Sequence, residues 1–525
     1  MPSPTQRAIE KLPSHLRRYV VAQDYDAYTP RDQAVWRHIL RRLKAHLSHK
    51  AHTVYLEGLD ATGISETHIP SLDEMNEKLE KLGWSAVSVR GFIPPAVFTE
   101  LQTLGVLAIA ADIRTNEHIA YTPAPDIVHE SAGHAPIIAN ARYSEYLRRC
   151  GEVGFKAIAS VEDEAVFEAI RNLSVVKEDP TASPVDILMA ENRLTATAAS
   201  RRYVSESTKA SRLYWWTAEY GLIGDLKAPK IYGAGILSSI GEAEHCLTDA
   251  VKKVPHSLVC TETEFDITTM QPQLFVAQDF EQLFDVLEAF EATLAWKQGG
   301  DFGLEEALRA RTVNHLVLAD GLQLTGKVVE RVCAGKKVAP GLSTAVARLE
   351  GPVMTSRDGK ATNRPWPGQA LVIFGEGQLP ERGAFSLEFP SGLFLTGFAV
   401  GGGEVVNLRG HLAGRPLDLP SWTLVFTSPT LPSVVGGPAD PGTWDQWFGE
   451  LNAFAAGEGE MKARERKAEA LPKALALLYT EARALRDSES LDELRLQAVE
   501  AAAAEYPEEW LLKAEIQELR EPVRT

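Results

Sequence analysis

The sequence is poor in cysteine: its 525 residues contain four, at positions 150, 246, 260 and 333. No two of them have the Cys-x-x-Cys spacing, which argues against a disulfide framework and against a cysteine metal site. The sequence also lacks any run of about 18 apolar residues, the length that crosses a bilayer. Its first residues, "MPSPTQRAIEKLPSHLRRYV", have no apolar core of the kind that directs export. We therefore expect a soluble, cytoplasmic protein that does not bind membranes.

Positive charge is in short supply as well. Lysine and arginine total 54 against 71 acidic residues, and the net charge is −17. Binding to nucleic acid needs a clustered positive surface, so we expect no nucleic-acid partner. The hydrophobic content of 45% and the charged content of 24% are typical of a globular protein. A chain of this length exceeds a single hydrophobic core and is expected to form several domains.

The distribution of residue types divides the chain into three parts. Residues 1–300 have mostly helical periodicity, as in 32–48 and in 71–83, where Ser71 and Glu74 form a capping box. Residues 301–435 are expected to form a β-rich module of unknown role, with short strands and turn signals from about residue 335.

Residues 436–525 are expected to form a helical tail, with a second capping box at Ser490 and Glu493. The expected fold is therefore a mainly α domain with small β elements, a β-rich module and a helical tail. The C-terminal region is a candidate surface for self-association or for a partner.

Two histidines lie close together in "YTPAPDIVHESAGHAPIIAN". His129 and His134 are five positions apart, about 140° on an ideal helix, whereas the His-Glu-x-x-His pattern of zinc proteases uses four. Gly133 and Pro136 predict that the helix stops there and folds His134 back toward His129. The pair could be metal ligands or ordinary buried histidines, and spacing alone identifies no third ligand.

Four segments in order carry a family resemblance. They are "YTPAPDIVHESAGHAPIIA", "LYWWTAEYGL", "KIYGAGILSSIGEAEHCL" and "MQPQLFVAQDF", and "HIPSLDEMNEKLEKLGW" precedes them. Together they resemble the pterin-dependent aromatic amino acid hydroxylases over about residues 20–295. The resemblance implies a monooxygenase that hydroxylates the ring of a free aromatic amino acid, with conversion of L-phenylalanine to L-tyrosine as the expected reaction.

The resemblance implies that His129, His134 and Glu219 hold Fe(II). Two imidazoles and one carboxylate form the facial ligand set of non-haem Fe(II) oxygenases. Iron alone cannot supply all the electrons that the reaction needs. A tetrahydropterin is the implied reductant, because the chain lacks the ligand order usual in 2-oxoglutarate enzymes. The substrates are then O2 and the amino acid.

The same resemblance gives roles to further residues. Glu130 is expected to face the pterin through water, Phe98 to stack on the pterin, and Tyr214 to lie near the iron. Arg114 is expected to bind the substrate carboxylate, for which a bidentate guanidinium is well suited. Other residues expected around the substrate are Thr122, Pro125, Trp215, Ser238 and Glu242.

Two features depart from the family pattern. The stretch between His134 and Glu219 is longer than usual, and nothing after about residue 300 has a recognised counterpart. Two alternatives to the hydroxylase remain open. One is a zinc-dependent hydrolase that uses the same three ligands, and the other is a non-catalytic scaffold with a relic hydroxylase core.

Overall fold

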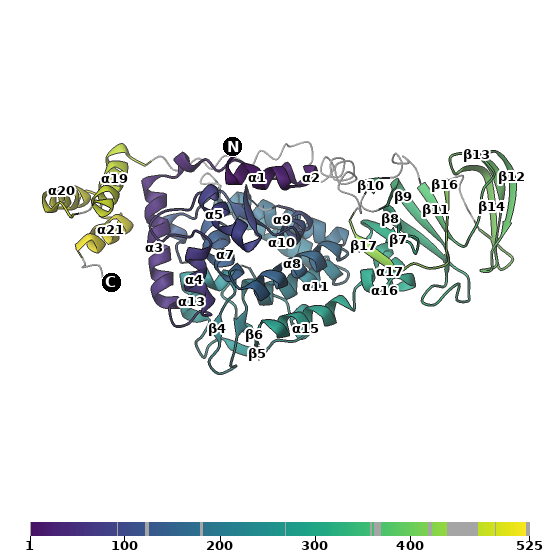
Figure 1. The fold of residues 1–525 in the computed structure, drawn as a ribbon, viewed down its shortest axis with the longest axis horizontal. Coiled ribbons are helices and arrows are strands. Elements are labelled where there is room, and N and C mark those ends of the chain that lie inside the picture. Colours follow the sequence, from purple (N-terminus) through teal and green to yellow (C-terminus); the bar gives the residue numbers. More distant parts are fainter. Residues whose placement is uncertain are drawn as a thin grey trace.

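A computed structural model of the protein describes residues 2–91, 93–120, 125–178, 182–267, 269–357, 360–361, 369–417, 423–437, 471–488 and 490–520. A helical body lies at the centre, with a β-rich module on one side and three C-terminal helices on the other (Figure 1). This order agrees with the expected helical, β-rich and helical parts. Among the described residues, no helix is long and apolar enough to cross a membrane.

The helical body contains most of the helices. Their bounds are α1 Pro4–Lys11, α2 Ser14–Arg17, α3 Pro30–Leu47, α4 Val54–Ala61, α5 Leu72–Leu79, α6 Pro95–Thr103, α7 Ala135–Ile138, α8 Ala141–Lys156, α9 Val161–Glu178, α10 Pro184–Ala199, α11 Glu206–Tyr214, α12 Ala234–Leu237, α13 Ile240–His245, α14 Val259–Glu262, α15 Phe280–Glu291, α16 Ala295–Gln298 and α17 Gly300–Ala310. The shorter elements are the 3-10 turns η1 Tyr25–Ala27, η2 Glu80–Leu82 and η3 Asn116–His118, and the π-helices η4 Val128–His134 and η5 Trp215–Glu219.

Two small sheets complete the helical body. In the first, β1 (Ser85–Val89) pairs in parallel with β2 (Val106–Ala110). The second has the order β4-β3-β6-β5, with the bounds β3 Leu222–Ile223, β4 Lys230–Ile231, β5 Lys252–Pro255 and β6 Gln273–Ala277. The strand β3 begins three residues after the end of η5, so the second sheet supports one side of the site described below.

Local capping signals explain where several helices begin. The predicted capping box is present at α5, where the hydroxyl of Ser71 accepts the N–H of Glu74. The apolar spacing of residues 280–298 predicts a single helix, but this prediction is wrong. The chain is extended at Leu294, between α15 and α16, and the N–H of Ala295 there donates to the carboxylate of Glu206 at 2.6 Å. A contact distant in sequence thus replaces one turn of helix.

Within the residues that the structure describes, the β-rich module is a sheet of eleven strands. The main order is β12-β13-β14-β16-β11-β9-β8-β7-β17, with β10 on β9 and β15 on β14. The prediction that strands begin near residue 335 is wrong, because β7 and β8 precede it. The strand bounds are β7 Val313–Val317, β8 Leu322–Cys333, β9 Thr344–Arg357, β10 Lys360–Ala361, β11 Gln369–Phe374, β12 Gly383–Glu388, β13 Leu393–Gly401, β14 Glu404–Leu412, β15 Arg415–Leu417, β16 Thr423–Thr427 and β17 Ser433–Gly436.

The β-rich module shares a hydrophobic core with the helical body. Ile158 and Ala295 from the body are buried in one cluster with Leu316, Leu324 and other residues of the sheet. At Gly436 in β17 an added Cβ would lie 2.4 Å from the carbonyl oxygen of Ala157, so only glycine allows this close approach. The core therefore crosses the expected boundary at residue 300.

The long stretch between His134 and Glu219 includes the packed helix pair α9 and α10. An ion pair of 2.9 Å between Lys177 and Glu191 joins the two helices. The outer side of α10 exposes the apolar residues Val185, Leu188 and Met189. The added length is thus accommodated as a helical excursion at the surface.

The C-terminal helices are α19 (Lys473–Asp487), α20 (Glu493–Ala503) and α21 (Trp510–Arg520). The helices α19 and α21 lie beside α3, and α20 packs on their outer side (Figure 1). Arg37 of α3 and Glu515 of α21 form an ion pair of 2.5 Å whose side chains are 4% and 5% exposed. The cap of α20 is Asp492, which accepts two backbone N–H groups, so the prediction of a cap at Ser490 is wrong. The tail is docked by charge as well as by apolar burial.

Candidate metal centre and active site

Two π-helices carry the histidines and the glutamate expected to bind metal. His129 and His134 lie in η4 and Glu219 ends η5. Hydrogen bonds in a π-helix join residues five apart, and this wider turn brings His129 and His134 to one face. The prediction that the helix stops at Gly133 is therefore wrong, because η4 continues into α7.

Gly133 has a different physical role. A Cβ added there would lie 2.6 Å from the carbonyl oxygen of Ala234, at the start of α12. Such a contact is too close for any side chain, so the glycine allows η4 and α12 to pack backbone against backbone. The residue after α12 is Ser238, which contacts His129. The close packing therefore positions a partner of a proposed metal ligand.

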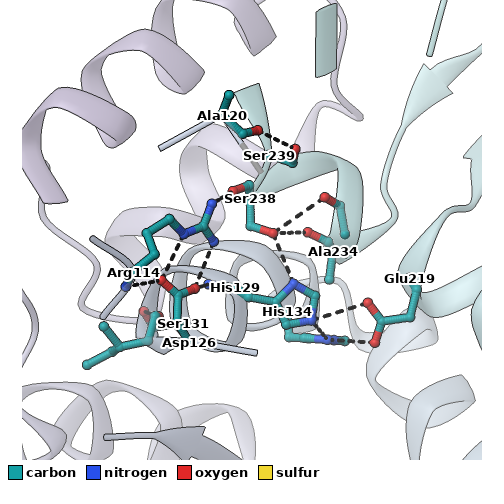
Figure 2. A network of polar contacts seen from close by, with 12 residues as sticks. Arg114, Ala120, Asp126, His129, Ser131, His134, Glu219, Ala234, Ser238 and Ser239 are labelled. Carbon is teal, nitrogen blue, oxygen red and sulfur yellow. Dashed lines mark hydrogen bonds and ion pairs between the residues drawn. The ribbon is translucent and has the colours of Figure 1, made fainter. Parts of the chain in front are cut away.

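The side chains of His129, His134 and Glu219 converge between the two π-helices (Figure 2). The Nε2 atoms of His129 and His134 are 3.2 Å apart. The carboxylate oxygens of Glu219 lie 3.3 Å from Nε2 of His129 and 3.1 Å from Nε2 of His134. Two imidazoles and a carboxylate around one point form a ligand set that fits a divalent transition metal.

A second carboxylate, Glu130, also lies near both histidines, and the ligand atoms of these three residues are within 4.8 Å of one another. The pKa values distinguish the two acids. Burial alone would raise the pKa of Glu219, but the neighbouring imidazoles of His134 and His129 outweigh it and lower the pKa below its usual value. Burial raises the pKa of Glu130 to about 8. The surroundings of Glu219 thus favour the ionised form that a ligand needs, whereas burial favours the protonated form of Glu130.

Ser238 determines the tautomer of His129. Its hydroxyl donates to the carbonyl oxygen of Ala234 at 2.7 Å and lies 3.0 Å from Nδ1 of His129. Since the hydroxyl proton is already used, Nδ1 of His129 is the donor in the second contact. The lone pair then resides on Nε2, which faces His134 and Glu219. A hydrogen bond on the remote nitrogen is how metal-binding histidines are usually oriented.

Arg114 is held by an acid that the sequence interpretation missed. The Nε and Nη2 atoms of Arg114 donate to the two carboxylate oxygens of Asp126 at 2.8 and 2.7 Å. Nη1 of Arg114 donates to the carbonyl oxygen of Ser238 at 3.0 Å. Of the five guanidinium N–H groups, two keep no partner among the residues that the structure describes.

Asp126 also connects Arg114 to the metal centre, because it accepts the backbone N–H of His129 at 3.0 Å. Burial would raise the pKa of Asp126, but Arg114 and the backbone donors outweigh it and lower the pKa. An acid three residues before His129, where a helix begins, is a common capping arrangement. That local signal could have identified Asp126 from the sequence.

Glu242 and Trp215 both contact Gln271. The buried carboxylate of Glu242 accepts the N–H of Gln271 at 3.1 Å, and burial raises its pKa to about 7. The acid that contacts Arg114 is Asp126 rather than Glu242. Trp215 stacks with two aromatic rings, as described below. Pro125 is exposed next to Asp126, and Thr122 lies outside the described residues.

Phe98 and Tyr214 lie on the other side of the histidines. Tyr214 stacks against His134 with 6.4 Å between ring centroids, and Phe98 meets Tyr214 edge-on at 5.7 Å. With Glu130, these residues line a cavity of about 10 Å³, which has room for about one water molecule. Two aromatic rings, a buried carboxyl group and a small cavity are therefore adjacent to the ligand atoms of the histidines.

The fold and the donor set define the class: a helical protein with a candidate mononuclear metal centre of two histidines and one carboxylate. Residues 19–173 and 191–303 match the sequence pattern of the biopterin-dependent aromatic amino acid hydroxylases. The chain belongs to this family. The match omits residues 174–190, which cover the junction of α9 and α10, and it ends at residue 303 near the start of the β-rich module.

Named relatives cover the same half of the chain. The phenylalanine-4-hydroxylase of Pseudomonas aeruginosa is 29% identical over 277 residues, which are 52% of this chain and 88% of the relative. That of Chromobacterium violaceum is 28% identical over 288 residues, or 54% of this chain and 82% of the relative. A crystal structure of the latter enzyme with iron(III) and 7,8-dihydrobiopterin is 27% identical and covers 56% of this chain and 92% of that chain, with a TM-score of 0.42.

Proposed function

We propose that the protein hydroxylates the ring of a free aromatic amino acid, converting L-phenylalanine to L-tyrosine with Fe(II), O2 and a tetrahydropterin. One observation carries the proposal: Ser238 bridges the two halves of the site (Figure 2). Its hydroxyl accepts from His129 and its carbonyl accepts from Arg114. A guanidinium suited to an amino acid carboxylate is therefore one residue away from the metal donors. The named relatives, at 28% and 29% identity, support phenylalanine as the substrate.

His129, His134 and Glu219 would hold the iron. Imidazole nitrogen and carboxylate oxygen suit Fe(II), and a facial set leaves further positions for other ligands. Bound there, iron and a reduced pterin together supply the electrons that activate O2. The chain's contribution is to hold the three donor atoms in place. Ser238 does this through Nδ1 of His129, and Asp126 does it through the backbone N–H of the same residue.

Phe98 and Glu130 are the proposed pterin contacts. A flat heterocycle stacks well on an aromatic ring, and the phenyl ring of Phe98 borders the cavity beside His134. With its pKa raised by burial to about 8, Glu130 keeps a carboxyl proton at neutral pH. It can donate that proton in a hydrogen bond to a water in the cavity, and the water can then bond the heterocycle. The small volume supports contact through water.

Arg114 is the proposed carboxylate anchor. Asp126 orients the guanidinium and neutralises its charge in the absence of substrate. The two remaining N–H groups can then donate to an amino acid carboxylate without rearranging the side chain, which is the advantage of a pre-organised site. Trp215, Pro125 and Thr122 remain the proposed contacts of the substrate ring.

The test is product identification. The protein is loaded anaerobically with Fe(II), then given a tetrahydropterin, O2 and phenylalanine, tyrosine or tryptophan separately. Products are identified by mass spectrometry and NMR. We expect tyrosine from phenylalanine, formed only with the pterin present. Stoichiometric iron without hydroxylation of any of the three amino acids would contradict the proposal.

A further inference from the structure

The indole of Trp215 is covered by two aromatic rings. Tyr220 stacks on it with 4.6 Å between centroids and 29° between ring planes. Phe265 stacks with 4.3 Å and 10°. Two flat rings this close to one indole centroid cannot lie side by side on one face, because neighbouring rings in one plane would overlap. Tyr220 and Phe265 therefore cover opposite faces and leave the edge of the indole accessible.

Phe265 belongs to an irregular segment that is tied down at both ends. At one end, the indole N–H of Trp216 donates to the carbonyl oxygen of Thr263 at 2.9 Å. At the other end, the buried side-chain amide of Gln271 donates to the carbonyl oxygen of Asp266 at 2.8 Å. An ordinary surface loop lacks such anchors. The segment that carries Phe265 is thus held in place, with the phenyl ring stacked on Trp215.

The same segment joins Trp215 to the proposed substrate side of the site. The indole N–H of Trp215 donates to the side-chain oxygen of Gln271 at 3.4 Å. The backbone N–H of Gln271 donates to Glu242, which lies on α13, directly after Ser238 and Ser239. Hydrogen bonds therefore connect Trp215 through Gln271 to Glu242. Glu242 belongs to the helix that begins two residues after Ser238, the residue that contacts Arg114.

We infer that Phe265 is a specificity-determining residue that sets the width of the amino acid pocket. It occupies one face of Trp215, so a substrate ring meets only the edge of the indole. The space that a two-ring side chain would need beside Trp215 is filled. The pocket then favours a single-ring amino acid over tryptophan. This inference rests on the proposed function, in which Trp215 contacts the substrate ring.

The test compares Phe265→Ala with Phe265→Tyr, which keeps the ring. Iron-loaded protein is titrated calorimetrically with phenylalanine and with tryptophan, and kcat and KM are measured for both. We expect Phe265→Ala to raise the preference for tryptophan over phenylalanine by about tenfold or more, mainly through KM. Phe265→Tyr should keep the original preference. Glu264→Gln, which removes the ion pair with Arg212 but no ring, is the matched control and should also keep it.

An unchanged ratio of affinities and of KM values in folded, iron-loaded Phe265→Ala would overturn the inference. If that variant does not fold, Phe265→Leu replaces it: a shift toward tryptophan supports the wall, and no shift overturns it. The wild-type protein in the same assays reports on the proposed function separately. Binding of phenylalanine without any turnover would refute the proposed reaction, while the affinity ratio would still decide the role of Phe265.

Discussion

Two clusters of buried charged groups differ in how their members satisfy one another. Where the tail docks, Glu515 lies between Arg37 and Arg486, with distances of 2.5 and 2.7 Å, so every acceptor faces a donor. In the metal centre, two imidazole nitrogens lie 3.2 Å apart beside one carboxylate. Two protonated imidazoles at that distance would repel each other. The first cluster pairs its carboxylate with two guanidinium groups, whereas the second offers ligand atoms that fit a metal cation.

The largest effect on iron binding and hydroxylation is expected from substitutions in the candidate metal centre. His134→Ala, His129→Ala or Glu219→Ala should each abolish tight iron binding and hydroxylation, because a facial site cannot hold iron with one donor missing. Bound iron is measured after anaerobic loading, and product by mass spectrometry. His118→Ala, at an exposed histidine, is the control and should behave as wild type. Full activity with stoichiometric iron in any of the three variants would refute the ligand assignment.

A substitution in the cluster around Glu515 should lower the stability of the docked tail and leave iron binding unchanged. Glu515→Ala removes the nearer of the two carboxylates that Arg37 and Arg486 share and leaves only Glu518, at 3.8 and 3.5 Å. Breaking a buried pair costs about 3–5 kcal/mol. We expect α19, α20 and α21 to lose hydrogen-exchange protection while iron content stays unchanged. Glu505→Ala, at an exposed glutamate of the tail, should change stability by less than about 0.5 kcal/mol. Loss of iron in Glu515→Ala would show that the two clusters are coupled.

Arg114 has features of both clusters. It has an ion pair with Asp126, and two of its N–H groups have no partner in the part of the chain that the structure describes. Arg114→Ala should raise the KM for the amino acid by about one to two decades, because a charged hydrogen bond contributes roughly 1.5–3 kcal/mol. It also leaves the buried carboxylate of Asp126 without its cation. The double variant Arg114→Ala/Asp126→Asn should recover stability but not KM. An unchanged KM in both variants would remove Arg114 from the substrate site.

Local signals in the sequence predicted much of the fold. The box of Ser71 and Glu74 marks the start of α5, because capping depends on residues three apart. The π-helices were not predicted, because apolar spacing reveals a helix but not a local change to wider turns. Leu294 is extended because Ala295 bonds Glu206, and no local pattern signals a contact so distant in sequence.

Only some residues of the candidate site were predicted, because contacts between residues distant in sequence leave no local pattern. The structure brings His129, His134 and Glu219 together, as the family resemblance implied. Phe265 was missed because it acts through a partner, Trp215, and single positions do not reveal partners. Asp126 carries a local capping signal, but its pairing with Arg114 leaves no such signal. The roles given to the individual residues stay predictions until variants are measured.

The smallest effect on the metal centre is expected from removing the C-terminal half. A chain ending at Gly300 keeps every proposed ligand and pocket residue, so it should bind iron and form some product. It should lose solubility, because Ile158 and Ala295 lose their core partners and α3 loses the tail. A chain ending at Gly437 keeps the sheet and is the matched control. A folded short chain without iron or product would place the C-terminal half in the active site.

We propose that His129, His134 and Glu219 hold iron for oxygen chemistry rather than zinc for hydrolysis. Metal-free protein is loaded with Fe(II) or Zn(II) in parallel, and bound metal, pterin-dependent O2 consumption and amino acid hydroxylation are measured together. We expect about one iron per chain, with O2 consumption and hydroxylated product only in the iron-loaded sample. Bound iron that consumes no O2 with pterin and amino acid present would contradict it, as would hydrolytic activity confined to the zinc-loaded sample.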